Sequence, residues 1–523
     1  MSTLERQGKP IRWDPYFAKA SYGKPGFLCV FLSNSKHILV IVAALWVYTL
    51  NRVYGEVYSA MGPCLPAVTY PRLPAWQVMA DRPQGGPKKR KPRILFGSYR
   101  YLLGVATVKK LLWMLGLLVI GLGVGVAILF WTHPFWFKKP IKIGILHSQT
   151  GTLGVNEQRL INAELLAIEE INNQGGINGR KIQAIIADGK SDETVFEQEA
   201  IRLITQEKVE VIIGCWASSA RKRVKAVVEH YNNLLLYPVV YEGLEESANI
   251  VYFGGTPNQT TIPAITWAFQ RFGKRFFLIG SDYVFSQVTH KIIELHLASL
   301  GGTVVGTTYI KPGGKVLPEQ IKQIADLKPD IVINTINGDT NISFFKELLN
   351  AGIASTKIPS MSMQISQADF QRFELKAIIG TYVLFNYAEE SSYSFNKEFI
   401  KKFRKKYGQD SKVGDAGQSA YSLIHVWAQA YAISKNSKPE LIIPEMKKMV
   451  YQSPSGIIYM SENQNCWQDA IINKLAYNGD LLELWKSKST IRPEVYPPYL
   501  TKDEWNQFMN NLYKNWGNRW SAV

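Results

Sequence analysis

The feature that most constrains the fold is a regular alternation of strand-like and helix-like segments that begins at Ile141. Short runs rich in Val, Ile, Leu and Phe are typical of buried strands, and longer segments with helical spacing of apolar residues separate them. The predicted strands span 141–147, 181–188, 209–214, 234–237, 275–280, 303–310 and 330–335, with 456–460 and 469–475 coming last. The predicted helices span 157–173, 193–207, 217–231, 258–272, 283–300, 318–327, 341–351, 392–407, 415–434 and 439–450. This alternation predicts an α/β fold in which helices cover both faces of parallel sheets, and right-handed crossovers then give two Rossmann-like lobes.

Polar and aromatic side chains cluster where two of the predicted strands end. The strand 209–214 is followed by Trp216 and Ser218, and Tyr237 closes the strand 234–237. Ligands of open α/β sheets bind at the carboxyl ends of strands, so these residues are candidate ligand contacts. They suit a small, flat ligand that forms hydrogen bonds. They do not suit a phosphate, because no glycine-rich loop followed by Lys is present.

Residues 111–137 contain no charged side chain and are predicted to form one transmembrane helix. About 20 apolar residues suffice to cross the hydrocarbon core of a membrane. Lys109 and Lys110 precede the segment, and Trp131 and Trp136 lie near its end, as in the aromatic belts of membrane helices. Basic residues are far more numerous before the segment than after it. The positive-inside rule therefore places the N-terminus in the cytoplasm and the residues after about 138 in the periplasm or outside the cell.

The segment 1–110 is basic, rich in proline in its second half, and of unknown role. It carries 17 Lys/Arg and 4 Asp/Glu, and so a net charge of +13 out of the +18 of the whole chain. The excess is a local feature and not a nucleic-acid signature, so no nucleic acid is expected as a partner. The segment is predicted to be cytoplasmic or poorly ordered. A second apolar run, 38–50, is too short to span a membrane and is interpreted as interfacial or disordered.

The four cysteines, Cys29, Cys64, Cys215 and Cys466, are scattered without the spacing of a metal site. Cys215 and Cys466 could pair in an oxidising compartment or remain two buried thiols. No nucleophile–base pair, metal cluster or cofactor motif stands out in the sequence. We therefore expect a binding protein that is not an enzyme and that needs neither a metal nor a cofactor.

Several motifs resemble type I periplasmic solute-binding proteins over about 141–500. The resemblance begins with Gly144-Ile-Leu-His-Ser-Gln-Thr-Gly-Thr and with Ala167-Ile-Glu-Glu-Ile-Asn-Asn-Gln-Gly-Gly-Ile-Asn-Gly-Arg. A likeness to the branch that binds urea and short-chain amides rests on Gly214-Cys-Trp-Ala-Ser-Ser-Ala-Arg-Lys, Tyr237-Pro-Val-Val-Tyr-Glu-Gly, Pro257-Asn-Gln, Gly280-Ser-Asp-Tyr-Val-Phe and Asn334-Thr-Ile-Asn-Gly-Asp. That branch comprises the binding subunits of ABC-type urea transporters and amide-sensing regulators. The resemblance implies a Venus-flytrap domain over 138–500, followed by a tail over 501–523.

The same motifs imply five ligand-binding residues. Trp216 would form an aromatic wall, Ser218 would offer a hydroxyl and Tyr237 a phenol, Tyr283 would be the contact from the closing lobe, and Asp339 would accept hydrogen bonds from ligand N–H groups. Urea presents four N–H donors and one acceptor, which a carboxylate, hydroxyls and backbone groups can pair. The alternative for Trp216 is that it packs in the core.

Some positions depart from the family pattern or have simpler interpretations. Ser366-Gln367 replaces a common acidic residue, and Asn465-Cys466-Trp467 replaces a pair of histidines before a tryptophan. Val239 matches the urea-binding relatives, whereas the amide-sensing relatives carry Thr, so Val239 favours urea. Arg221-Lys222-Arg223 is interpreted as a solvated helix face, and Asp282 as a helix cap.

The predicted function is that of a membrane-anchored solute-binding protein. It would capture urea or a short-chain amide by closure of two lobes and feed an ABC-type transporter. A sensor domain in a transmembrane signalling protein is the first alternative, with a signalling partner in place of the permease. An amidase is the second, and its Cys215 would need a base or a positive field beside the thiol. In each case we expect a single-pass protein of the plasma membrane with its C-terminal domain outside the cytoplasm.

Overall fold

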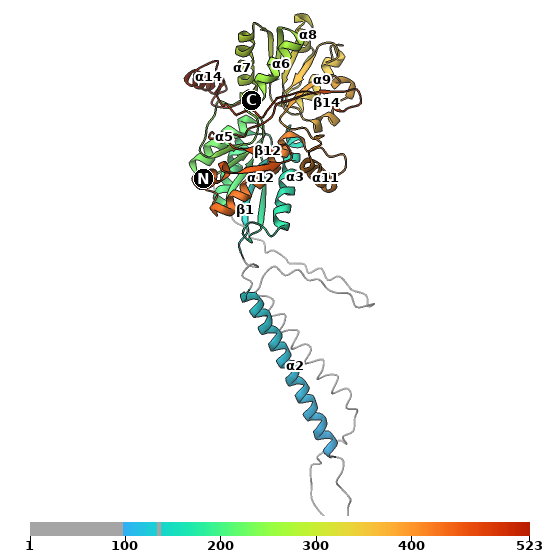
Figure 1. The fold of residues 1–523 in the computed structure, drawn as a ribbon, viewed down its shortest axis with the longest axis vertical. Helices are drawn as coiled ribbons and strands as arrows, with labels where there is room; N and C mark the ends of the chain where they lie inside the picture. Colours follow the sequence, from blue (N-terminus) through green and yellow to red (C-terminus); the bar gives the residue numbers. More distant parts are fainter. Residues whose placement is uncertain (1–97, 133–137, 523) are drawn as a thin grey trace, which may run out of the picture. The chain divides into compact units, whose positions relative to one another are not determined.

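The computed structural model describes residues 98–132 and 138–522 (Figure 1). Helix α2 (Ser98–Thr132) contains an apolar segment, Thr107–Gly125, of 19 residues with a mean hydropathy of 1.8, which is long and apolar enough to cross a membrane. Helix α2 includes most of the predicted transmembrane span 111–137. Residues 133–137 lie outside the described part of the chain, as do residues 1–97 with the apolar run 38–50 and two of the cysteines.

Lobe 1 is built on a five-stranded parallel sheet with the order β2-β1-β3-β4-β5. Its strands are β1 (Ile141–His147), β2 (Ile182–Asp188), β3 (Val211–Gly214), β4 (Leu235–Tyr237) and β5 (Ile250–Tyr252). Its helices are α3 (Gly154–Asn173), α4 (Glu193–Arg202) with the π-helical η2 (Leu203–Glu207), α5 (Ser218–His230), α11 (Ser394–Tyr407), α12 (Gly414–Ser434) and α13 (Pro439–Lys447). One hydrophobic cluster, which includes Ile143, Ile213 and Trp427, joins the sheet to helices from both halves of the sequence.

Lobe 2 is built on a seven-stranded sheet with the order β14-β13-β10-β9-β8-β6-β7. Its strands are β6 (Arg275–Ser281), β7 (Thr303–Ile310), β8 (Ile331–Thr335), β9 (Ser360–Ser362), β10 (Tyr382–Phe385), β13 (Ile471–Leu475) and β14 (Leu481–Lys486). Its helices are η3 (Pro257–Gln259), α6 (Thr261–Phe272), α7 (Val284–Leu300), α8 (Pro318–Leu327), α9 (Thr340–Asn350), η4 (Gln367–Arg372), α10 (Leu375–Ile378) and α14 (Lys502–Asn515). A separate hairpin is formed by β11 (Val450–Ser453) and β12 (Gly456–Tyr459). Figure 1 shows α6, α7, α8 and α9 gathered in lobe 2, and α3, α5 and α12 gathered in lobe 1.

The central strands β6, β8 and β10 of the lobe 2 sheet are buried, which explains why they are mostly apolar. Along β6, Phe276 and Leu278 join the cluster formed with α6 and α7, whereas Phe277 and Ile279 join the cluster formed with α8 and α9. Successive side chains of a strand point to opposite faces, so one strand supplies both cores. The predicted α/β fold with two lobes is confirmed.

The prediction of wholly parallel sheets is wrong at one edge of lobe 2. Strand β13 pairs antiparallel with β10 and with β14, so this sheet is mixed. The sequence pattern did not predict β5, β9, β10, β11 and β14, because strands of three to six residues are too short to show a clear period. Part of the predicted tail 501–523 is helical, because Thr501 and Glu504 form a capping box that starts α14.

Two buried amides join the segments that pass between the lobes. The chain crosses after β5, after β10 and before β13. Gln259 Nε2 donates to the carbonyl oxygens of Cys466 at 2.9 Å and Ile491 at 2.7 Å. Asn386 Nδ2 donates to those of Gln259 at 3.3 Å and Asp469 at 2.6 Å. These bonds hold the crossings together as one hinge region.

Candidate ligand-binding site

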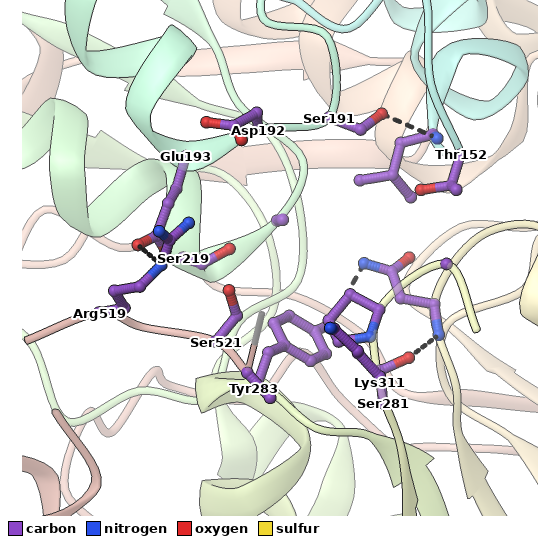
Figure 2. Close-up of a pocket in the computed structure, with 16 residues that line it drawn as sticks. Thr152, Ser191, Asp192, Glu193, Ser219, Ser281, Tyr283, Lys311, Arg519 and Ser521 are labelled. Carbon is purple, nitrogen blue, oxygen red and sulfur yellow. Dashed lines mark hydrogen bonds and ion pairs between the residues drawn. The ribbon is translucent and has the colours of Figure 1, made fainter. Parts of the chain in front are cut away.

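A cavity of about 320 Å³ lies between the two lobes (Figure 2). Lobe 1 contributes the segments that follow β1, β2 and β3, and lobe 2 contributes the segments that follow β6, β7 and β8. The residues around the cavity are Thr152, Leu153, Ser191, Asp192, Glu193, Ala217, Ser219, Ser281, Tyr283, Lys311, Pro312, Gly313, Asn337, Arg519, Ser521 and Ala522. The carboxyl ends of parallel strands from both sheets therefore face one cavity, as expected for this type of fold.

Asn337 joins the two lobes across this cavity. Its Oδ1 accepts a hydrogen bond from the indole N–H of Trp216 in lobe 1 at 3.0 Å. Its Nδ2 donates to the hydroxyl of Tyr283 in lobe 2 at 3.3 Å, and its backbone N–H donates to Ser281 Oγ at 3.0 Å. Trp216 and Tyr283 are 7% and 3% exposed, so these bonds are shielded from bulk water. Sequence reasoning missed Asn337, although it follows β8 within the motif that begins at Asn334.

Two of the five predicted residues lie behind the cavity wall. The hydroxyl of Tyr237 is buried and donates to the backbone oxygen of Trp216 at 2.9 Å, so Tyr237 holds the loop that carries Trp216. Burial raises the pKa of Tyr237 well above its ordinary value, so the phenol stays neutral. Ser218 donates to Glu242 at 2.5 Å and accepts from Arg221 at 2.9 Å, whereas its neighbour Ser219 borders the cavity.

The other three predicted residues differ in their position relative to the cavity. Tyr283 borders the cavity directly. Trp216 reaches its edge through the bond to Asn337. Asp339 is 43% exposed and forms an ion pair with Arg372 at 2.6 Å, and it is not among the residues around this cavity. Asp282, interpreted as a cap of α7, accepts instead from the side chain of Gln287 at 3.0 Å.

A buried ionic cluster joins helix α5 of lobe 1 to the loop that follows β4. Arg221 pairs with Glu242 at 2.8 Å and with Glu245 at 3.0 Å, and Lys222 pairs with Glu245 at 2.9 Å. Burial on its own would raise the pKa of Glu245, but Arg221 and Lys222 hold it well below its ordinary value. The interpretation of 221–223 as a solvated helix face is therefore wrong for Arg221 and Lys222, which are 0% and 8% exposed. Their partners, Glu242 and Glu245, lie in a loop, and sequence periodicity does not predict the position of a loop.

The acidic side chains of the cavity already have partners. Asp192 caps α4 and accepts from the backbone N–H groups of Thr194 at 2.7 Å and Val195 at 3.1 Å. The carboxylate of Glu193 lies 3.3 Å from Arg223 and 3.6 Å from Arg519. Burial raises the pKa of Glu193, and the two guanidinium groups oppose that shift. Both carboxylates are thus engaged within the protein, and hydroxyl groups, an amide and the ammonium group of Lys311 also border the cavity.

A second buried charged group lies beneath the end of β1. His147 is fully buried, and its two ring nitrogens lie 2.9 Å from Glu157 and 2.9 Å from Glu164. Burial on its own would lower the pKa of His147, but the two carboxylates raise it to about 10. Burial raises the pKa of Glu164. In the part of the chain that the structure describes, no group of three or more His, Cys, Asp or Glu side chains could hold a metal ion.

Cys215 and Cys466 are free, buried thiols and do not form a disulfide. Burial raises the pKa of Cys215 well above its ordinary value. A thiol in this state is a poor nucleophile, which removes the basis for an amidase mechanism at this residue.

These features define a two-lobed binder that encloses a small polar cavity between its lobes. The periplasmic binding protein domain model matches residues 141–502, and the chain belongs to that family. Members of this family bind solutes without transforming them, so the protein is a binding protein and not an enzyme.

Solved structures share the same fold. A solute-binding protein of an ABC transporter from Rhodopseudomonas palustris BisB5, in complex with 3,4-dihydroxybenzoic acid, is 21% identical with a TM-score of 0.61, and the match covers 68% of this chain and 98% of that one. A leucine-binding protein from Thermotoga maritima is 18% identical with a TM-score of 0.60, and the match covers 66% of this chain and 98% of that one. Likeness at this identity concerns the fold alone.

A curated relative matches over a short stretch. Limonene hydroxylase from Geobacillus stearothermophilus is 23% identical over 116 residues, which make up 22% of this chain. The match spans only 21% of the length of that relative.

Proposed function

We propose that the protein is a membrane-anchored solute-binding protein that captures urea or a short-chain amide and delivers it to an ABC-type transporter. The observation that carries the proposal is the amide of Asn337, which borders a cavity of about 320 Å³ and links Tyr283 to Trp216 at its edge. This volume is at the low end of the range for ligand pockets, which favours a small ligand. The hydroxyls of Ser219 and Ser281 can accept from amide N–H groups, and the carboxylate of Glu193 is already paired with Arg223.

The predicted residues take different roles in this proposal. Tyr283 and Trp216 contact the ligand, and Tyr237 and Ser218 act as positioning residues through the bonds already described. Asn337 takes the part that the sequence analysis gave to Asp339. Val239, which is 2% exposed, is the residue that the resemblance to urea-binding proteins implies at this position.

Anchoring is the second half of the proposal. Helix α2 would span the membrane once, so that the binding domain stays at the outer face beside its permease. The same anchor favours the sensor alternative, in which lobe closure would act on a membrane partner instead of a permease.

The test is ligand-dependent stability of the full-length chain in detergent micelles. Urea and acetamide, each well below denaturing concentrations, are expected to raise the melting temperature, because a ligand at about 100 times its Kd adds roughly 2.7 kcal/mol to stability. Isoleucine and 3,4-dihydroxybenzoate serve as controls and should have no effect. A shift with either control and none with the two amides would assign the protein to a different ligand class.

A further inference from the structure

We propose that residues 516–522, which we call the strap, form a wall of the ligand site and hold the two lobes closed, so that ligand exchange requires the strap to leave lobe 1. The proposal deepens the solute-binding function and rests on it. Arg519, Ser521 and Ala522 border the cavity beside residues of both lobes (Figure 2). The strap is thus part of the site and not only an appendage of α14.

The strap is fixed to lobe 2 by backbone bonds. Val284 N–H donates to the oxygen of Trp520 at 3.0 Å, and Ala522 N–H donates to the oxygen of Asp282 at 2.9 Å. These bonds flank Tyr283, which pairs with Ser521 in an antiparallel bridge. The strap therefore sets the position of the ligand-facing Tyr283.

The preceding helix adds an apolar anchor on the same lobe. Trp505 and Met509 of α14 pack with Val288 and Ile292 of α7 in one cluster, and Trp505 is 0% exposed. Trp516 and Trp520 pack against the edge of this cluster. Leu244 and Ala217 of lobe 1 also touch this cluster, but most of its buried members belong to α7 and α14, which makes lobe 2 the main attachment of the strap.

The contacts of the strap with lobe 1 are made mostly by charged side chains. The backbone N–H of Trp520 donates to Glu193 at 3.3 Å, and Arg519 lies 3.6 Å from the same carboxylate. Arg223 donates to the oxygen of Asn518 at 3.0 Å. Lys222 Nζ lies 5.0 Å from the ring centre of Trp520, within the range of a cation–π contact.

The two attachments differ in strength, and this difference gives the direction of release. The lobe 2 side combines a backbone bridge with a buried aromatic cluster. The lobe 1 side consists of the contacts of Glu193 with Arg519 and the strap backbone, together with single contacts from Arg223 and Lys222. Opening of the lobes should therefore break the contacts at Glu193 first and leave the strap on lobe 2.

The experiment measures ligand release and strap exposure in the full-length chain in detergent. Trp520→Ala removes the ring that faces Lys222 without changing a residue that borders the cavity, and Glu193→Gln weakens the charged contacts. Both variants should raise the dissociation rate of acetamide about tenfold or more, and both should speed hydrogen exchange in 516–522. Trp520→Phe should restore wild-type behaviour. Glu445→Gln, which breaks a surface pair with Lys448 on α13, is the matched control and should change neither quantity.

The outcomes separate this proposal from the proposed ligand. If neither acetamide nor urea binds the wild type, the ligand assignment fails, and hydrogen exchange alone then decides about the strap. Fast exchange of 516–522 in the wild type, or unchanged exchange in both variants, would overturn the proposal. Tighter ligand binding in Trp520→Ala would also overturn it, because the strap would then be a plug that competes with the ligand.

Discussion

We expect ligand binding to depend most on the side-chain amide of Asn337. Asn337→Ala removes the bonds to Trp216 and Tyr283, and each neutral hydrogen bond contributes about 0.5–1.5 kcal/mol. The affinity for acetamide should therefore fall roughly 5- to 150-fold, measured by calorimetry on the full-length chain.

Asp339→Asn is the matched comparison for this variant. The pair with Arg372 is partly exposed, and such pairs contribute about 0–1 kcal/mol, so we expect little change in affinity or stability. A larger loss of affinity in Asp339→Asn than in Asn337→Ala would restore the sequence-based assignment of the ligand acceptor.

His147 gives the chain a pH-dependent contribution to stability. Its pKa is about 10 in the folded state against an ordinary 6.5, so the folded protein retains a proton that the unfolded chain loses. The contribution is fully present below about pH 6.5 and is lost as the pH rises to about 10, at up to about 1.4 kcal/mol per pH unit. The stability difference between the wild type and His147→Gln should narrow over this range in guanidinium chloride unfolding. Parallel pH profiles for the two proteins would contradict this account.

At the scale of elements, helix α5 shows why a charged run can be buried. Ser218, Arg221 and Lys222 lie three and four residues apart and share one face of the helix, which turns to Glu242 and Glu245. Arg221→Met leaves these two carboxylates buried with less compensation, and breaking a buried pair costs about 3–5 kcal/mol.

The expected result is a large drop in the melting temperature of Arg221→Met. Arg223→Met is the control. The side chain of Arg223 is partly exposed and lies against the strap, so this variant should lose far less stability. Equal losses in the two variants would mean that the cluster around Arg221 contributes no special stability.

The elements also show what the sequence could predict. The long strands β1 and β7 were predicted with their observed ends, because runs of seven and eight residues carry a clear pattern. The rule that ligands bind at strand carboxyl ends pointed to the segment after β3, which borders the cavity, and to Tyr237 at the end of β4, which lies behind the cavity wall. The sequence did not favour Asn337 over Asp339. Both residues lie in the loop after β8, and only the path of the backbone decides which of them borders the cavity. The roles of Arg519 and Ser521 depend on the packing of α14 on lobe 2, which no local pattern encodes.

At the scale of the whole molecule, the ligand site depends on segments that lie far apart in the chain. The hinge amides Gln259 and Asn386 join crossings separated by more than a hundred residues. The strap adds a further contact between the lobes from residues 516–522. The arrangement of the two lobes therefore depends on contacts from the complete domain.

Membrane topology is the prediction that concerns the whole molecule. Eight basic residues lie at 88–110, and three lie at 138–142. Short flanking segments with more Lys and Arg stay in the cytoplasm, so a reporter fused near residue 105 should behave as cytoplasmic and one fused after residue 523 as external. Replacing the basic residues at 88–93 by Gln should weaken this orientation and produce a mixed population. The same change at three exposed lysines of lobe 2, Lys322, Lys328 and Lys346, should not. A cytoplasmic reporter after residue 523 in the unaltered chain would rule out capture of solutes from outside the cell, because the cavity between the lobes would then face the cytoplasm.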